Sequence, residues 1–157
     1  MSQPIRWVLL AYRLPREPST PRIAVWRQLR RLGVAQVSDG VVALPLDART
    51  REQLEWIADT VIEHQGEATV WLAEPGSVAQ GRALARQMSE AIDAEYAGLI
   101  ARAGTTVAGS ATTRRRTLGA LRRELGRIQA RDFFRSTSRD RARAAVERLA
   151  VSLEAAS

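Results

Sequence analysis

The sequence contains no cysteine, no lysine and only one histidine, His64. Without cysteine the chain has no disulfide, no thiolate metal site and no cysteine nucleophile. A single histidine leaves a multi-histidine metal site or a histidine-based catalytic triad without partners. No apolar run approaches the roughly 20 residues of a membrane-spanning helix, and no secretory signal opens the chain. We therefore expect a cytoplasmic protein that binds no metal, needs no cofactor and does not enter a membrane.

All 24 basic side chains are arginine, and they are unevenly distributed along the chain. Residues 1–101 hold 11 arginines against 12 acidic residues, whereas residues 102–157 hold 13 arginines against 5 acidic residues. The codon bias of a GC-rich genome accounts for the choice of arginine, but not for its concentration in the last third. A near-neutral body with a basic tail is the pattern expected of a protein that binds the phosphate backbone of nucleic acid.

At 157 residues the chain is long enough for one compact domain plus an appendage. The apolar run at residues 7–12 is typical of a buried central strand. A proline-rich turn and a helix follow, with Ser19 or Thr20 as the expected cap and Gly33 as the expected stop. Two short strands, at 34–37 and 41–44, then flank the hairpin pair Asp39-Gly40.

The next elements are a helix and a fourth strand. The helix begins with the capping box Thr50-x-x-Gln53 and ends at Gly66, and the strand covers residues 68–73. The resulting order, β-α-β-β-α-β, predicts an α+β fold with a ferredoxin-like antiparallel sheet. Two helices cover one face of such a sheet, so the other face needs a cover from the rest of the chain or from a partner subunit.

The remainder of the chain is predicted to be helical. A capping box at Ser77 and Gln80 opens an added long helix that reaches Ala103. The uncharged stretch of small residues at 104–113 is typical of a flexible linker. Two apolar stripes with helical spacing then predict a basic C-terminal helical hairpin over residues 114–155. The predicted domains are a ferredoxin-like core plus the long helix at 6–103, the linker, and the hairpin.

Several blocks of sequence, in order along the chain, match the motifs of a known family. They are residues 12–19 (YRLPREPS), the helix at 22–33, Asp39-Gly40-Val41 with Leu44-Pro45, Arg51-x-x-x-Glu55-Trp56, Asp93-Ala94-Glu95-Tyr96, residues 121–125 (LRREL) and Asp132-Phe133-Phe134. Through these blocks the chain resembles the N-terminal domain of the chromate-resistance regulator, from about Arg6 to Leu153.

The resemblance implies a bacterial transcriptional regulator of a chromate-efflux operon, whose partners are operator DNA and chromate as inducer. It implies a ferredoxin-like core similar to those of the CRISPR spacer-acquisition nuclease and the phenylacetate-degradation repressor. We therefore expect a homodimer whose interface includes the sheet or its edge. The sequence departs from the family by ending where longer members continue into a second domain, and by the Gly/Thr/Ser stretch at 104–113.

The nuclease relative raises the alternative of metal-dependent catalysis. A Mg²⁺ site of that type needs an acidic ligand directly after the first strand. Tyr12-Arg13 occupies this position, and a guanidinium repels a metal ion. Asp39 and Asp47 remain, but Asp39 is expected to form the hairpin turn. We therefore do not expect an enzyme.

The basic tail supplies the candidate DNA-binding residues, which flank the leucine stripe of the first hairpin helix: Arg114, Arg115, Arg116, Arg122, Arg123 and Arg127. Few acidic residues lie near them in the sequence, which favours phosphate contact over a merely solvated helix face. A protein-interaction module that never touches nucleic acid is the main alternative function.

A second arginine cluster surrounds the proline-rich turn and the start of the first helix. Chromate is a tetrahedral dianion, and two or three arginines at a helix N-terminus suit such an oxyanion. Arg13, Arg16 and Arg22 are the candidate ligands. The alternative is that these arginines form ion pairs, as with Glu17, or are simply solvated.

Overall fold

The computed structural model describes residues 4–155, in which strand β1 (Trp7–Arg13) is an interior strand of a four-stranded sheet. The other strands are β2 (Ala35–Ser38), β3 (Val41–Pro45) and β4 (Glu67–Ala73). Their order across the sheet is β2-β3-β1-β4, and all three neighbouring pairs are antiparallel. The fold is therefore α+β with an antiparallel sheet, and the four strands were all predicted from the sequence to within one residue at each end.

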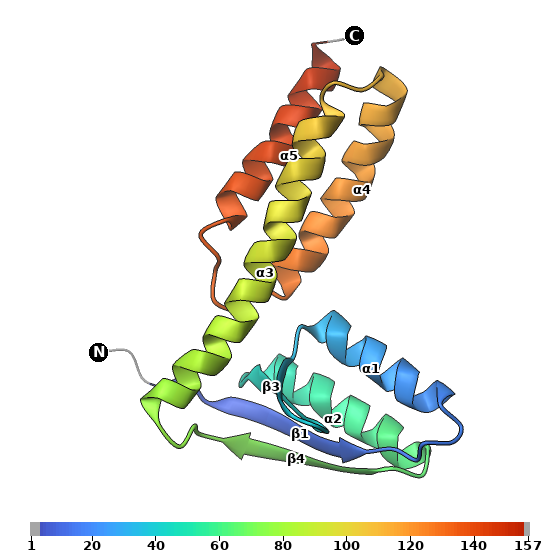
Figure 1. Ribbon diagram of the computed structural model, residues 1–157, viewed down its shortest axis with the longest axis vertical. Helices are drawn as coiled ribbons and strands as arrows, with labels where there is room; N and C mark the ends of the chain where they lie inside the picture. The colour runs from blue at the N-terminus through green and yellow to red at the C-terminus, as the bar shows by residue number, and fades with distance from the viewer. Residues whose placement is uncertain (1–3, 156–157) are drawn as a thin grey trace. The chain divides into compact units, whose positions relative to one another are not determined.

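Five helices complete the described chain, which divides into two units between Met88 and Ser89. We call residues 4–88 the sheet unit and residues 89–155 the helical unit (Figure 1). The helices are α1 (Thr20–Leu32), α2 (Ala48–Glu63), α3 (Val78–Thr106), α4 (Ala111–Ala130) and α5 (Arg139–Glu154). Helix α3 continues from one unit into the other, whereas the sequence analysis assigned the whole long helix to the core at 6–103.

Helices α1 and α2 lie on the same face of the sheet and contact each other (Figure 1). Val8 and Leu10 of β1 are fully buried on this face. Leu29 of α1 and Leu54 of α2 are also fully buried, in agreement with the helical stripes in the sequence. Burial of each such side chain stabilises the fold by about 1.5–3 kcal/mol.

Two glycines fix the turns that the sequence predicted. Gly33 ends α1 in the left-handed conformation, with φ of 80°. Gly40 follows Asp39 in the β2–β3 hairpin with φ of 73°. A Cβ at Gly40 would lie 2.6 Å from the carbonyl oxygen of Tyr12, so both the conformation and the close approach require glycine.

Helix α2 begins earlier and ends earlier than predicted. Its cap is Asp47, whose carboxylate accepts a hydrogen bond from Thr50 N at 2.7 Å. The Thr50 hydroxyl accepts a hydrogen bond from Asp47 N at 3.0 Å, so Thr50 closes the capping box rather than opening one. At the other end His64 is the C-cap, two residues before the predicted stop at Gly66.

The connection between α3 and α4 is shorter than the linker predicted at 104–113. Residues 104–106 belong to α3 and residues 111–113 to α4, which leaves four residues between the helices. Ser110 caps α4, since its hydroxyl accepts a hydrogen bond from Thr113 N at 3.2 Å. Thr105 and Thr106 therefore lie at the end of α3, whereas Ser110, Thr112 and Thr113 start α4.

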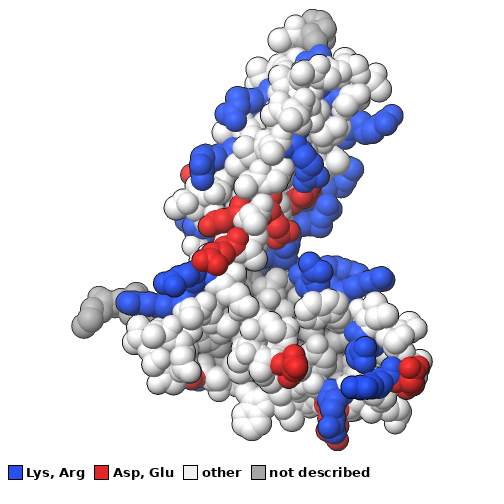
Figure 2. Space-filling view, in the orientation of Figure 1, with Lys and Arg blue, Asp and Glu red and all other residues white. Residues whose placement is uncertain are grey.

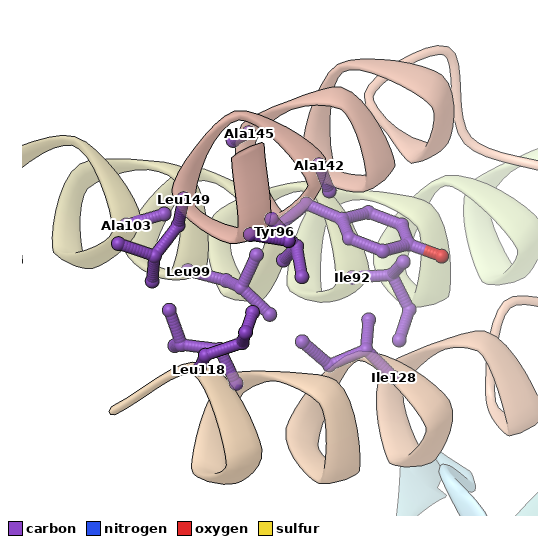
Figure 3. Close-up of a cluster of buried hydrophobic side chains, with 12 residues drawn as sticks. Ile92, Tyr96, Leu99, Ala103, Leu118, Ile128, Ala142, Ala145 and Leu149 are labelled. Carbon is purple, nitrogen blue, oxygen red and sulfur yellow. The ribbon is translucent and has the colours of Figure 1, made fainter. Parts of the chain in front are cut away.

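The helical unit has its own apolar core between the C-terminal part of α3 and the hairpin of α4 and α5 (Figure 3). Leu99 and Tyr96 of α3, Leu121 and Ile128 of α4, and Leu149 of α5 are almost completely buried. The predicted stripes of both hairpin helices face this core, so the predicted C-terminal helical hairpin is present. The structure adds α3 as its third partner.

Candidate functional site

Helix α4 presents most of the candidate DNA-binding arginines away from its core stripe. Five of the six predicted side chains are exposed: Arg115, Arg116, Arg122, Arg123 and Arg127. We call these five the α4 arginine face. Within residues 4–155, none of the five guanidinium groups forms a hydrogen bond or an ion pair. Their guanidinium groups are therefore free to contact a phosphate backbone.

Figure 2 shows that basic side chains gather over α4 and α5. Helix α5 adds exposed Arg143 and Arg148, which the sequence analysis did not single out. The helical spacing of the sequence could have predicted that both side chains are exposed, because they fall outside the stripe that contains Ala142, Val146 and Leu149.

Arg114, the sixth predicted residue, has a different environment. It is half buried, and its Nη1 donates a hydrogen bond to the carbonyl oxygen of Ser152 in α5 at 2.9 Å. Its position explains this, since residues 114, 118, 121 and 125 follow one helical stripe and the leucines of that stripe face the core. The Arg114 side chain thus joins α4 to the C-terminal end of α5.

Two acidic residues of the helical unit pair with arginines outside the α4 arginine face. Arg131 forms a two-armed ion pair with Glu95, with N–O distances of 2.5 and 3.1 Å. Arg102 pairs with Glu124. Both pairs join α3 to the α4 region, and they engage Glu95 and Glu124 with Arg131 and Arg102.

Two of the sequence motifs meet in space at one end of the helical unit. The Tyr96 hydroxyl donates to the Asp132 carboxylate at 2.9 Å, and that carboxylate also accepts from Ser136 N at 2.9 Å. The Ser136 hydroxyl donates to Asp93. Burial is the main cause that raises the pKa of Tyr96 above its usual value of 10.0. The hydrogen bond to Asp132 and the negative charge of Asp132 raise this pKa further. This network fixes the α4–α5 loop against α3, and so fixes the end of α4.

The predicted oxyanion ligands are brought together only in part. Arg13 and Arg22 line one cavity of about 530 Å³ in the sheet unit, beside Trp26 and Asp39. Arg16 is not among the residues that line it. Arg13 also pairs with Glu67 at 3.3 Å in an exposed position, where such a pair is worth about 1 kcal/mol or less. Burial raises the pKa of Tyr12, another lining residue.

Within residues 4–155, no three histidine or acidic side chains lie together in a way that could hold a metal ion. In the same part of the chain, no helix combines the length and hydropathy that crossing a membrane requires.

Comparison with known proteins found one family. The family described as Protein ChrB, N-terminal, matches residues 22–157, which is most of the chain. The match leaves out residues 12–19, one of the blocks that carried the resemblance, and β1. No curated protein and no solved structure matches the chain.

Proposed function

The chain belongs to the ChrB N-terminal family, a chromate-resistance-related regulatory domain, and we propose that it regulates its target genes by binding DNA through α4. The observation that carries this proposal is the α4 arginine face: five exposed arginines without a protein partner among the described residues. Proteins bind the phosphate backbone with such residues, because each contact releases condensed counterions from the DNA. The proposed site of action is the operator of a chromate-resistance operon, in the cytoplasm.

Arg114 is left out of the proposed DNA contact. Its guanidinium is engaged with Ser152, and moving it to a phosphate would break a part-buried hydrogen bond. The remaining five side chains divide by position: Arg116, Arg123 and Arg127 share one side of α4, and Arg115 and Arg122 share the other. Arginine is suited to both backbone and base contact, since its fork also fits guanine in the major groove.

The ferredoxin-like assignment is part of the proposal. The sheet unit has the chain order β-α-β-β-α-β with two helices on one face, which is the pattern of a split βαβ fold. The order β2-β3-β1-β4 supports the same assignment, because it places the first and third strands side by side in the interior of the sheet.

The cavity at Arg13 and Arg22 is the proposed site for chromate as inducer. Two guanidinium groups on one cavity wall attract a tetrahedral dianion. Glu67 would have to release Arg13, at a small cost because both side chains are about four-fifths exposed. Asp39 in the same wall opposes an anion, so Arg16 or solvent ions would have to complete the neutralisation.

A gel-shift series with the promoter DNA beside the chain's own gene tests the proposal, with and without chromate. We expect retarded DNA without chromate and weaker retardation with it. Absence of retardation at micromolar protein and low salt would favour a module that binds only protein partners. Incubation with Mg²⁺ and the same DNA should leave the DNA intact; cleavage would favour the nuclease alternative.

A further inference from the structure

The second face of the sheet, opposite α1 and α2, is apolar and only partly covered. Trp7, Leu9 and Ala11 of β1 point to this face, because they alternate with Val8 and Leu10. In the sheet register Leu9 lies between Ala43 of β3 and Trp71 of β4. Paired residues of neighbouring strands share a face, so Trp71 projects from the same side as Leu9.

This face contains a cavity of about 570 Å³, which lies within the sheet unit. Its apolar wall includes Trp7 and Leu9 from β1, and Leu84 from the first turns of α3. Its polar lining is mainly the three amides of Gln36, Gln80 and Gln87. Cavities of roughly 300–1,000 Å³ with apolar walls and a few polar groups typically hold an aromatic or aliphatic group.

Trp71 projects beside this cavity and is 59% exposed. The indole Nε1 donates a hydrogen bond to the Thr69 hydroxyl of the same strand at 2.8 Å. Its one polar group therefore has a partner within its own chain, so the ring can leave water without leaving an N–H unpaired. An exposed tryptophan with its hydrogen bond already satisfied has the properties of an interface anchor.

We propose that two copies of this chain associate through the second face of the sheet, with Trp71 of each copy in the cavity of the other. The Trp71 side chain and the cavity lie next to each other on the same face of the sheet, since Leu9 lines the cavity and pairs with Trp71. A two-fold axis places the Trp71 side chain of each copy at the cavity of the other. A second copy therefore supplies both the tryptophan and the cavity that receives it.

The charge of the cavity lining is compatible with a second copy as the occupant. Each chain carries a net charge of +7, so two copies repel unless their contact excludes the arginines. Among the residues that line the cavity the only charged one is Glu74, and no arginine lines it. The inference is independent of the proposed DNA contact, because it uses only residues of the sheet unit.

The cysteine-free sequence allows a direct crosslinking test on the full chain. We would prepare Trp71→Cys and Leu84→Cys separately, mix them, and oxidise the mixture. A disulfide between the two variants is expected, because position 71 of one copy would lie against position 84 of the other, and the mixed dimer keeps the Trp71 anchor of the Leu84→Cys chain. The matched control replaces Trp71→Cys by Trp56→Cys, since Trp56 is 71% exposed on α2. Equal crosslinking in both mixtures would overturn the proposal.

Light scattering supplies the second measurement and does not depend on cysteine. At tens of micromolar the unmodified chain should have twice its 17.3 kDa mass. Trp71→Arg should raise the dimer dissociation constant about a hundredfold or more, because each dimer loses two anchors, whereas Trp56→Arg should leave it unchanged. Circular dichroism confirms that both variants fold. A monomeric unmodified chain, or a dimer that survives Trp71→Arg, would refute this interface.

Discussion

The sheet unit and the helical unit differ in the aromatic side chains that they expose and in their balance of charge. All four tryptophans lie in the sheet unit, and Trp26, Trp56 and Trp71 are exposed there. The helical unit instead buries Tyr96 completely, and both units expose arginine. Residues 1–88 hold 11 arginines and 9 acidic residues, whereas residues 89–157 hold 13 and 8. Exposed aromatic surface suits contact with protein and exposed arginine suits contact with nucleic acid. The proposed self-association therefore uses the sheet unit, and the proposed DNA contact uses the helical unit.

The largest expected effect on stability comes from a substitution in the core of the helical unit. Leu149 is fully buried between α3 and α4, so Leu149→Ala leaves a cavity in that core. We expect a loss of about 2–5 kcal/mol in the free energy of unfolding, measured by urea denaturation. The matched control is Trp56→Ala at an exposed site, with an expected change of about 0.5 kcal/mol or less. Similar losses for the two variants would contradict the division into buried and exposed apolar surface.

The Tyr96 network gives a smaller effect with a defined pH dependence. Tyr96→Phe removes a buried hydrogen bond to a carboxylate, which is worth about 1.5–3 kcal/mol at neutral pH. The folded protein raises the pKa of Tyr96, so above pH 10.0 the unfolded chain loses this proton while the folded chain keeps it. The ionisation of Tyr96 should therefore leave the unfolding free energy of the unmodified protein unchanged below that pH and should lower it above.

Denaturation series at pH 7 and just above pH 10 check this prediction. The Phe variant should be less stable at pH 7 and should show a weaker decline above pH 10, because it has no phenol at position 96. An equally steep decline in both proteins would show that Tyr96 is not the group responsible.

The cap of α2 in the sheet unit gives the smallest of these effects. Asp47→Ala removes the carboxylate that accepts from Thr50 N, and we expect a loss of about 1 kcal/mol. Asp39→Ala is the control, since Asp39 lies in a turn and caps no helix. The two variants are compared by thermal unfolding, and a larger shift for Asp39→Ala would contradict the assigned cap.

The strands and the buried stripes of the helices were predictable because their apolar periods are regular. The strands at 34–37 and 41–44 and the Asp39-Gly40 turn needed only local rules. The start of α2 was not predicted, because Asp47 and Thr50 are both good caps and only the geometry distinguishes N-cap from N3. The predicted length of the linker was wrong for a similar reason, because a short run of Ser, Thr and Gly is compatible with a loop and with the first turn of a helix.

The candidate site was predictable to the level of the element and not of each residue. The concentration of arginine identified α4, but Arg114 was grouped with its neighbours by sequence proximity. Its place in the stripe with Leu118 and Leu121 was visible in the spacing, and that place decides its role. The cavity that Arg13 and Arg22 share, without Arg16, is formed where β1, α1 and the β2–β3 turn come together. No local sequence pattern specifies how these three elements pack.

The salt dependence of DNA binding tests the central claim, that α4 binds the phosphate backbone, most directly. Arg116→Gln, Arg123→Gln and Arg127→Gln are combined, because these three residues share one side of α4. The control combines Arg27→Gln, Arg30→Gln and Arg31→Gln, which remove the same charge from exposed positions of α1. We expect the α4 variant to lower the slope of log K against log salt by about 2–3 units, and the α1 variant to leave it unchanged. An unchanged slope for a folded α4 variant, or an equal drop for both, would contradict the account.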